Sequence, residues 1–338
     1  MTARFDPAVP FVPRGAVSAE GRRALATGAV SAGREGLARF HLSGPGRITS
    51  LQGLVTADVE GAGDGAHLFG ALLTPKGMIV APLWITRLGD TILVEVPVEA
   101  AAAVQEAFTR SLPPRLCRAQ DVTTATAAIG LYGPQAQKAL AAAAPGDPPP
   151  VGRAAELRAG ETRIVAARVA ARGLTGFDLV VPAQAAEPLL AALQWHGAAP
   201  AEPALIEERR ILAGFPRLGA EIDERTIPQE VRLDDLGGVS YTKGCYVGQE
   251  TVARVRFRGH PNRQLVGLAL GEAAPPALPE RIVDGDRYLG RLTSAAWCEQ
   301  AGQYLGLAVV RREIQMGTTL SRPCGADALV HPLPWPDP

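Results

Sequence analysis

The sequence lacks a long apolar run and an N-terminal segment suited to export. No uninterrupted apolar stretch approaches the roughly 20 residues needed to cross a bilayer, and Pro82 interrupts even the apolar segment 79–85. Pro7, Pro10 and Pro13 break up the residues that would form the core of a signal peptide. We therefore expect a cytoplasmic protein that does not interact with a membrane.

The sequence also lacks an excess of either charge. Lys and Arg together number 34, and Asp and Glu also number 34, so the chain has no overall field that would attract nucleic acid or an acidic membrane. Direct binding of tRNA is therefore disfavoured. Any role with nucleic acid would have to come from a local patch.

Cysteine is scarce, and its spacing is wrong for a metal site. The four cysteines are Cys117, Cys245, Cys298 and Cys324, with no C-x-x-C pair and no neighbouring histidine. A zinc or iron–sulfur site usually needs such a cluster, so we expect no bound metal. Wide spacing and a reducing compartment favour free thiols over disulfides.

What is present predicts a globular α+β protein. Hydrophobic residues make up 47% of the chain and charged residues 20%, and 338 residues exceed the usual size of a single core. A strand, helix and hairpin order occurs before residue 120 and again between 121 and 258, which predicts two related α/β lobes. Short strand-like runs after Arg258 favour a small antiparallel barrel or sandwich at 259–338.

The segment 228–258 concentrates glycines, one cysteine and charged groups. Gly244 and Gly248 flank Cys245 and permit positive φ or close approach of a ligand to the backbone. A nearby Lys243 ammonium would favour the thiolate, which makes Cys245 the best candidate for a reactive sulfur. The alternative is a buried structural thiol, the commoner state of a lone cysteine.

Arg254, Arg256 and Arg258 alternate with apolar residues in this segment. A strand would place the three guanidinium groups on one face, where they would hold the glutamate tail of a folate or an RNA phosphate. A solvated edge strand explains the same pattern.

Asp178 follows a glycine-rich turn at the start of a predicted strand. Its carboxylate can accept two parallel N–H bonds, and a pterin ring offers such a two-donor edge. An exposed turn aspartate is the plain alternative.

The chain resembles the YgfZ-type folate-binding proteins of the glycine-cleavage T-protein superfamily. The most specific match is KGCYVGQE at Lys243–Glu250. Supporting matches span most of the chain: SGPGRITSLQGLVTADV at Ser43–Val59, LLTPKGMIV at Leu72–Val80 and RRILAGFPRLGAEIDERTIPQE at Arg209–Glu230.

The resemblance implies two ferredoxin-like or related lobes at 1–120 and 121–258 and a C-terminal antiparallel β-barrel at 259–338. It implies that tetrahydrofolate or another reduced folate binds near the centre and that the protein maintains iron–sulfur enzymes, including those that modify tRNA. Its partners would be those enzymes or cluster-assembly proteins. Taken with the patterns above, it implies Cys245 and Lys243 for chemistry, and Asp178, Tyr246, Gly248, Gln249 and Glu250 for the folate; Arg254 is a candidate folate contact from the arginine alternation alone.

One departure concerns catalysis. T-proteins that transfer an aminomethyl group carry an aspartate a few residues after the TPKG-like turn, where this chain has Ala81 and Pro82. Neither side chain can hold a proton or orient a substrate electrostatically. A classical aminomethyltransferase is therefore disfavoured, although a folate-dependent transferase or demethylase that uses another carboxylate, such as Asp58 or Glu95, stays open.

Overall fold

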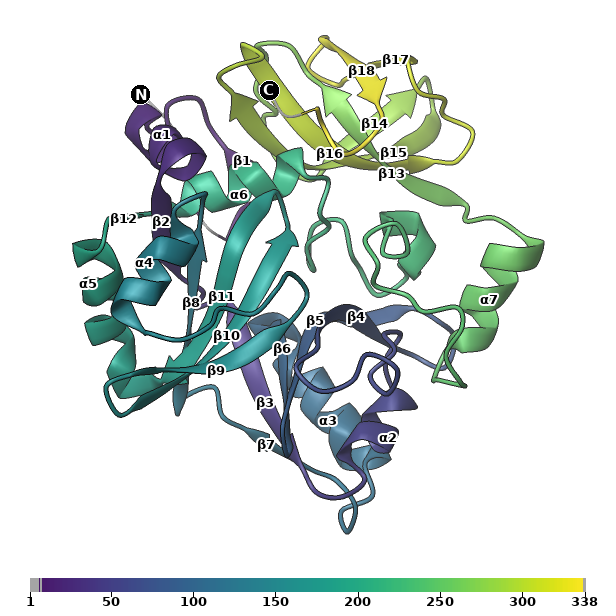
Figure 1. The fold of residues 1–338 in the computed structure, drawn as a ribbon. Coiled ribbons are helices and arrows are strands. Elements are labelled where there is room, and N and C mark those ends of the chain that lie inside the picture. The colour runs from purple at the N-terminus through teal and green to yellow at the C-terminus, as the bar shows by residue number, and fades with distance from the viewer. Residues whose placement is uncertain (1–5, 7, 337–338) are drawn as a thin grey trace.

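Three β-sheets organise the chain in the computed structural model, which describes residue 6 and residues 8–336 (Figure 1). The first sheet is antiparallel and has the order β4 (His67–Leu73), β5 (Ile79–Leu88), β6 (Thr91–Pro97), β3 (Leu37–Ser43) and β7 (Arg118–Asp121). Helices α2 (Arg47–Gln52) and α3 (Ala101–Ser111), the latter preceded by the 3-10 turn η1 (Val98–Ala100), belong to this lobe. Its core includes Phe40 and Phe108, whose rings meet edge to face 5.6 Å apart.

The second sheet has the order β12 (Ala198–Pro200), β2 (Ala29–Gly33), β8 (Thr126–Tyr132), β11 (Leu174–Pro182), β10 (Thr162–Ala171) and β9 (Ala154–Ala159). Its helices are α1 (Ala19–Thr27), α4 (Ala136–Ala143) and α5 (Ala186–Trp195), with η2 (Ala183–Ala185) before α5. Ser18 begins α1 by accepting a hydrogen bond from the backbone N–H of Gly21.

The two lobes contain the same two kinds of turn. Gly44 (φ 110°) and Gly133 (φ 111°) each end a strand before a Pro and a short helix, and a Cβ at either would lie under 3 Å from a backbone oxygen. Pro97 and Pro182 each end a strand and precede a 3-10 turn that runs into a helix. Both turns need glycine, because only Gly tolerates such close contact at positive φ.

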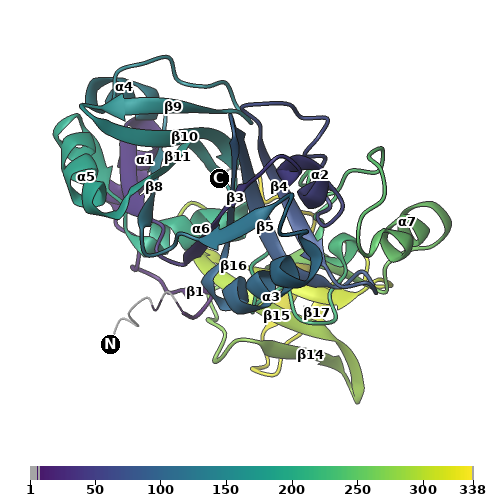
Figure 2. The same cartoon turned by 90° about the horizontal axis from the view of Figure 1, so that it is seen from below.

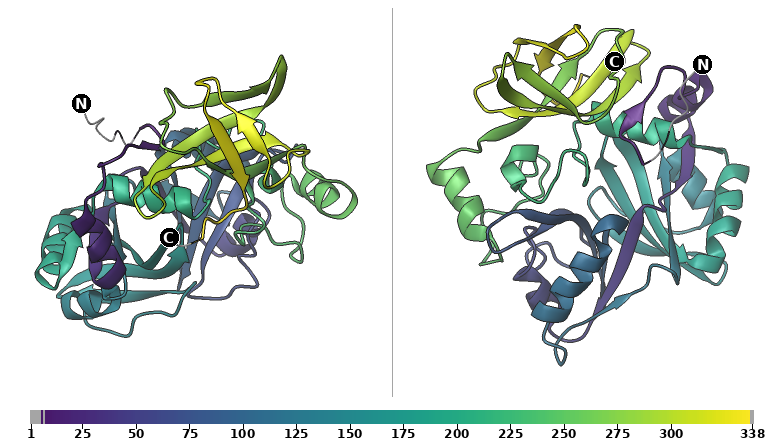
Figure 3. Two further views of the ribbon diagram at one scale, coloured as in Figure 1. Left: turned by 90° about the horizontal axis from the view of Figure 1, so that it is seen from above. Right: turned by 180° about the vertical axis from the view of Figure 1, so that it is seen from behind.

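The third sheet has seven strands in the order β1 (Phe11–Val12), β15 (Arg287–Cys298), β16 (Gln303–Arg311), β13 (Arg263–Ala269), β18 (Asp327–His331) and β17 (Thr319–Ser321), with β14 (Glu280–Asp284) also paired to β15. Among the described residues no ladder closes this sheet by joining β14 to β17. The C-terminal β-barrel that we expected is therefore not confirmed: the sheet curls but stays open (Figures 1 and 3).

The connection from the second lobe to the third sheet contains α6 (Pro203–Leu212), η3 (Pro228–Val231) and α7 (Gln249–Arg258). Helix α7 lies at the edge of the molecule, away from the second lobe (Figures 1 and 2).

The predicted α+β class is confirmed. The predicted domain boundaries stay a prediction. Strands β1 and β2 belong to the segment 1–120, yet β1 pairs within the third sheet and β2 within the second. No helix in the described residues combines the length and apolar character needed to span a membrane.

Candidate functional site

Asp178 lies fully enclosed where the first two sheets approach each other. It is 2% exposed, on β11. Its Oδ1 accepts hydrogen bonds from the Tyr132 hydroxyl at 2.7 Å and from Arg172 Nη2 at 3.0 Å. Its Oδ2 lies 2.7 Å from Arg172 Nη2 and 3.2 Å from Arg34 Nη2. The alternative of an exposed turn aspartate is therefore wrong.

The charges around Asp178 keep it ionised. Burial by itself raises the pKa of this carboxyl, but the guanidinium groups of Arg172 and Arg34 outweigh burial and hold the pKa well below its usual range. Burial and the neighbouring carboxylate raise the pKa of Tyr132, so its hydroxyl stays a donor. The site thus holds a fixed negative charge inside the protein.

Aromatic rings form a wall beside this charge. The His67 ring stacks on Trp84 with centres 5.0 Å apart, and Phe69 and Phe215 lie 4.9 Å apart. The guanidinium carbon of Arg172 lies 5.0 Å from the centre of the Trp84 ring. A cation is attracted to the face of an indole ring, so this position is favourable for the guanidinium.

Two cavities share this wall. One, of 620 Å³, is lined by Phe69 and Trp84 together with the segments 57–62, 168–171 and 236–240. The other, of 150 Å³, is lined by the same two rings and by Arg172, Glu95 and Pro82 among others. The wall is therefore the common boundary of a large open cavity and a small apolar one.

The KGCYVGQE segment is a loop that leads into α7. Lys243 is 8% exposed, and its ammonium donates hydrogen bonds to the carbonyl oxygens of Gln52, Val55 and Ala57 at 2.6, 2.7 and 2.8 Å. Burial lowers the pKa of Lys243 to about 8, against the opposing attraction of Asp58 and Glu60. All three N–H donors are used, so these contacts give Lys243 a structural role, and its predicted effect on Cys245 stays a prediction.

Cys245 itself is exposed, so the alternative of a buried structural thiol is wrong for this residue. Gly248 has φ 83°, and a Cβ there would lie 2.6 Å from the Thr74 carbonyl oxygen. Gly244 has open space around it and no positive φ, so only one of the two expected glycine constraints is present. Tyr246 is buried, and its hydroxyl has no hydrogen-bond partner in the described structure.

The predicted arginine strand is wrong, because 249–258 is helix α7. Gln, Glu, Ala and Arg favour a helix, and Gly248 in the left-handed region allows the chain to enter it. Arg254 and Arg258, four residues apart, share one face of the helix, whereas Arg256 lies on another flank. There Arg256 approaches the Tyr241 ring at 5.3 Å and Asp234 at 4.0 Å.

Gln249 and Glu250 form the first turn of α7, Glu250 being exposed and Gln249 half-buried. Their predicted folate contacts, and those of Tyr246, Gly248 and Arg254, stay predictions. Among the cavities of the described residues, the two that meet at Phe69 and Trp84 take no lining residue from Tyr246–Glu250. Tyr246 nevertheless packs in the same hydrophobic cluster as Phe69 and Phe215, so the loop lies behind the aromatic wall and lines neither cavity.

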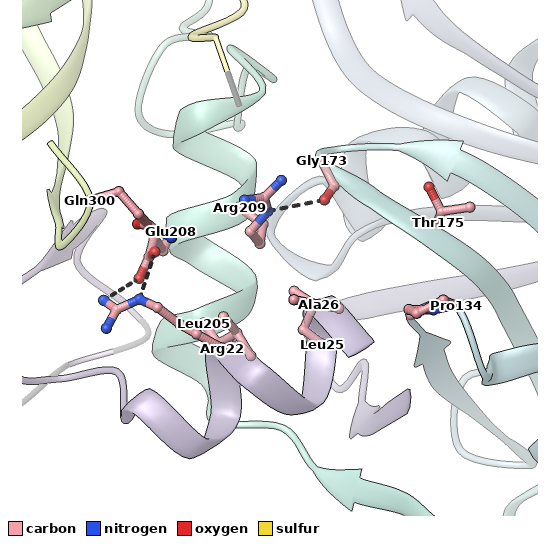
Figure 4. A pocket seen from close by; sticks show the side chains of 11 residues that line it. Arg22, Leu25, Ala26, Pro134, Gly173, Thr175, Leu205, Glu208, Arg209 and Gln300 are labelled. Atoms are coloured by element: carbon pink, nitrogen blue, oxygen red, sulfur yellow. Dashed lines mark hydrogen bonds and ion pairs between the residues drawn. The ribbon is translucent and has the colours of Figure 1, made fainter. Parts of the chain in front are cut away.

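A further cavity of 490 Å³ lies between α1, α6 and the β10–β11 turn (Figure 4). Arg22 donates from Nε and Nη2 to Glu208 at 3.1 and 2.9 Å, and Arg209 Nε donates to the Gly173 carbonyl at 3.2 Å. The Arg22 charge is thus already matched. None of the residues predicted for the site lines this cavity.

Sequence reasoning missed Arg34, Arg172 and Trp84. A signal existed for Arg172: it precedes Gly173, and with φ 59° and 69° they form the turn between β10 and β11. Such turns prefer Asn-Gly, so an arginine there points to a role for its side chain. Arg34 and Trp84 carry no local signal, because their partners lie on other strands.

Comparison with known proteins adds to this geometry. A family model described as the GCVT N-terminal domain matches residues 8–237. The tRNA-modifying protein YgfZ of Cronobacter sakazakii is 29% identical over 305 residues, covering 87% of this chain and 89% of that protein. The protein of the same name from Serratia proteamaculans is 30% identical over 256 residues, covering 74% and 72%.

Two aminomethyltransferases are similar as well. That of Rubrobacter xylanophilus is 29% identical over 303 residues, covering 86% of this chain and 79% of that protein. The crystal structure of glycine cleavage system aminomethyltransferase T from Bartonella henselae has a TM-score of 0.78 at 19% identity, covering 96% of this chain and 91% of that one. At this identity the match shows a common fold.

Proposed function

Because the chain belongs to the family of the GCVT N-terminal domain, and within the T-protein superfamily to the YgfZ-type branch, we propose that it binds a reduced folate. The observation that carries the proposal is that one guanidinium, that of Arg172, contacts both the Trp84 ring and the enclosed Asp178 carboxylate, next to two cavities that Trp84 lines. A pterin is flat and presents two adjacent N–H donors, which suit an aromatic face and a carboxylate.

The residues present fit such a ligand. Trp84 would stack on the ring, and Asp178 would accept the two N–H bonds. Trp84 lines both cavities, and Asp178 lies behind Arg172, which lines the smaller one; the larger cavity, at 620 Å³, lies within the roughly 300–1,000 Å³ of small-molecule sites. A bound reduced folate would supply a carrier for one-carbon groups.

The binding experiment is equilibrium titration with several reduced folates under anaerobic conditions. We expect dissociation constants of about 1 μM or lower, or about −8 kcal/mol. Asp178→Asn keeps the shape and removes the charge, and it should weaken binding. A folded wild-type protein that binds none of these folates would end the proposal.

We further propose that the protein acts in the cytoplasm and supports iron–sulfur enzymes, including those that modify tRNA. Cys245 supports this role because its thiol is exposed on a loop that Lys243 and Gly248 hold in place. The relatives from Cronobacter and Serratia carry the name tRNA-modifying protein. In cells that lack the wild-type gene, Cys245→Ala should impair cluster enzymes while the variant accumulates normally; full activity of those enzymes would remove the thiol from the mechanism.

A folate-dependent transferase or demethylase is the second candidate. Glu95 favours it, because this carboxylate lines the small cavity together with Pro82, near the place of the missing acid. Glu95 accepts a bond from Arg34 Nη1 at 3.2 Å. Turnover of a methylated or aminomethylated substrate, lost in Glu95→Gln, would favour the enzyme over the accessory protein.

A further inference from the structure

The Arg172 guanidinium occupies the place that a pterin edge would take in the proposed site. Its Nη2 lies 3.0 and 2.7 Å from the two oxygens of Asp178, and its Cζ lies 5.0 Å from the Trp84 ring centre. The pterin edge with the 2-amino group and N3–H is itself a planar guanidine-like unit. Arg172 and such a ligand therefore offer the same planar donor chemistry to the same two partners.

The acceptor capacity of Asp178 is full while Arg172 is in place. A carboxylate offers about four acceptor positions. On Asp178 they are taken by Tyr132, by Arg34 and by two contacts from Arg172. A ligand with two N–H donors can bind Asp178 only after one of these partners leaves.

Arg172 is the partner that can leave most easily. Tyr132 is 2% exposed, and its hydroxyl bonds to Asp178. Arg34 also holds Glu95, so its departure would leave two buried carboxylates without that cation. The Arg172 side chain is 15% exposed and belongs to a two-residue turn, from which it can rotate toward solvent.

Departure of Arg172 would also open the space that the ring needs. The small cavity has 150 Å³, below the usual range for small-molecule sites, and Arg172 forms part of its wall beside Trp84. Rotation of the side chain would enlarge this cavity and uncover the indole face together.

We propose that Arg172 is an internal competitor of the folate, and that a ligand binds only by replacing its guanidinium on Asp178 and Trp84. This inference rests on the proposed function. It makes Arg172 a specificity-determining residue: only a planar ligand with a guanidine-like edge offers Asp178 and Trp84 the contacts that Arg172 gives up.

The test compares tetrahydrofolate binding to the wild type and to Arg172→Asn, by titration and stopped-flow fluorescence. Asn tolerates the positive φ and is too short to reach Asp178. Removal of the competitor should raise the affinity about tenfold or more, mainly through faster association. The matched control is Arg158→Asn, on the neighbouring strand β9 with a side chain 65% exposed, which should leave the affinity unchanged.

The outcomes separate the two proposals. If the wild type binds and Arg172→Asn binds equally or more weakly, Arg172 is not a competitor, and folate binding stands. If neither folded protein binds any reduced folate, the proposed function fails. If Arg172→Asn does not fold, a second experiment on the wild type decides. 6-methyltetrahydropterin should bind at least about tenfold tighter than its 2-oxo analogue, which lacks the amino donor. Equal affinities would overturn the proposal that Arg172 competes with the ligand.

Discussion

Glu95 of β6 and Asp178 of β11 are held by the same guanidinium, that of Arg34. Nη1 lies 3.2 Å from Glu95 Oε1, and Nη2 lies 3.2 Å from Asp178 Oδ2. The two carboxylates come from the first and second sheets, so this cation joins the two lobes at the proposed site.

Replacement of Arg34 should therefore destabilise the protein strongly. Arg34→Met leaves two buried carboxylates without their shared cation, and we expect a loss of about 3–5 kcal/mol in the free energy of unfolding, measured in urea. The control, Arg163→Met, breaks an exposed pair with Glu156 and should cost about 1 kcal/mol or less. Similar small losses in both variants would contradict the role given to Arg34.

Lys243 should contribute to stability independently of any chemistry at Cys245. Lys243→Met removes three hydrogen bonds to buried carbonyl oxygens, and the free energy of unfolding should fall by about 2–4 kcal/mol. Lys138→Met, on the exposed side of α4, should change it by no more than about 0.5 kcal/mol. A Lys243 variant as stable as the control would show that the ammonium contributes little to the fold.

The two glycines around Cys245 should respond differently to alanine. At Gly248 the added Cβ meets the Thr74 carbonyl oxygen at φ 83°, so we expect a loss of about 1–3 kcal/mol. At Gly244 nothing lies within 4 Å, so Gly244→Ala should be nearly neutral. Thermal unfolding of the two variants checks this, and an equal response would mean that the loop is not held at Gly248.

Acid should destabilise the protein through His67. Burial lowers the pKa of His67 to about 4, whereas the same histidine in the unfolded chain has a pKa near 6.5. Between these values the unfolded state binds more protons, so stability falls as the pH drops from about 6.5 to about 4, by up to about 3 kcal/mol. His67→Phe keeps a ring against Trp84 and should flatten this part of the stability curve; a curve parallel to that of the wild type would contradict the assignment.

Thiol accessibility gives a simple check of the loop. Cys245 and Cys324 are exposed, whereas Cys117 and Cys298 are buried, where burial raises their pKa. A thiol reagent should label two sulfurs quickly in the native protein and four after denaturation. Cys245→Ser should remove one of the fast sites, and labelling of only Cys324 in the native wild type would refute the exposed loop.

Local signals carried much of the prediction. The strand, helix and hairpin order and the segment KGCYVGQE depend on residues close in sequence, so they were readable from the chain; β4 and β5 form the hairpin of the first lobe. The family assignment came from the same segments, and the family model confirms it. Helix α7 was misread because the alternation from Arg254 to Arg258 has the period of a strand.

The amino-acid sequence by itself determined the α+β class, the turns and the cysteine-bearing loop, because glycine, proline and hydrophobic period act over a few residues. Only the tertiary structure decided that Arg34 joins Glu95 to Asp178, that Lys243 bonds to carbonyls of another segment, and that Arg172 covers Trp84. These contacts join strands and loops distant in the chain, and a buried charge finds its partner only when the sheets pack together.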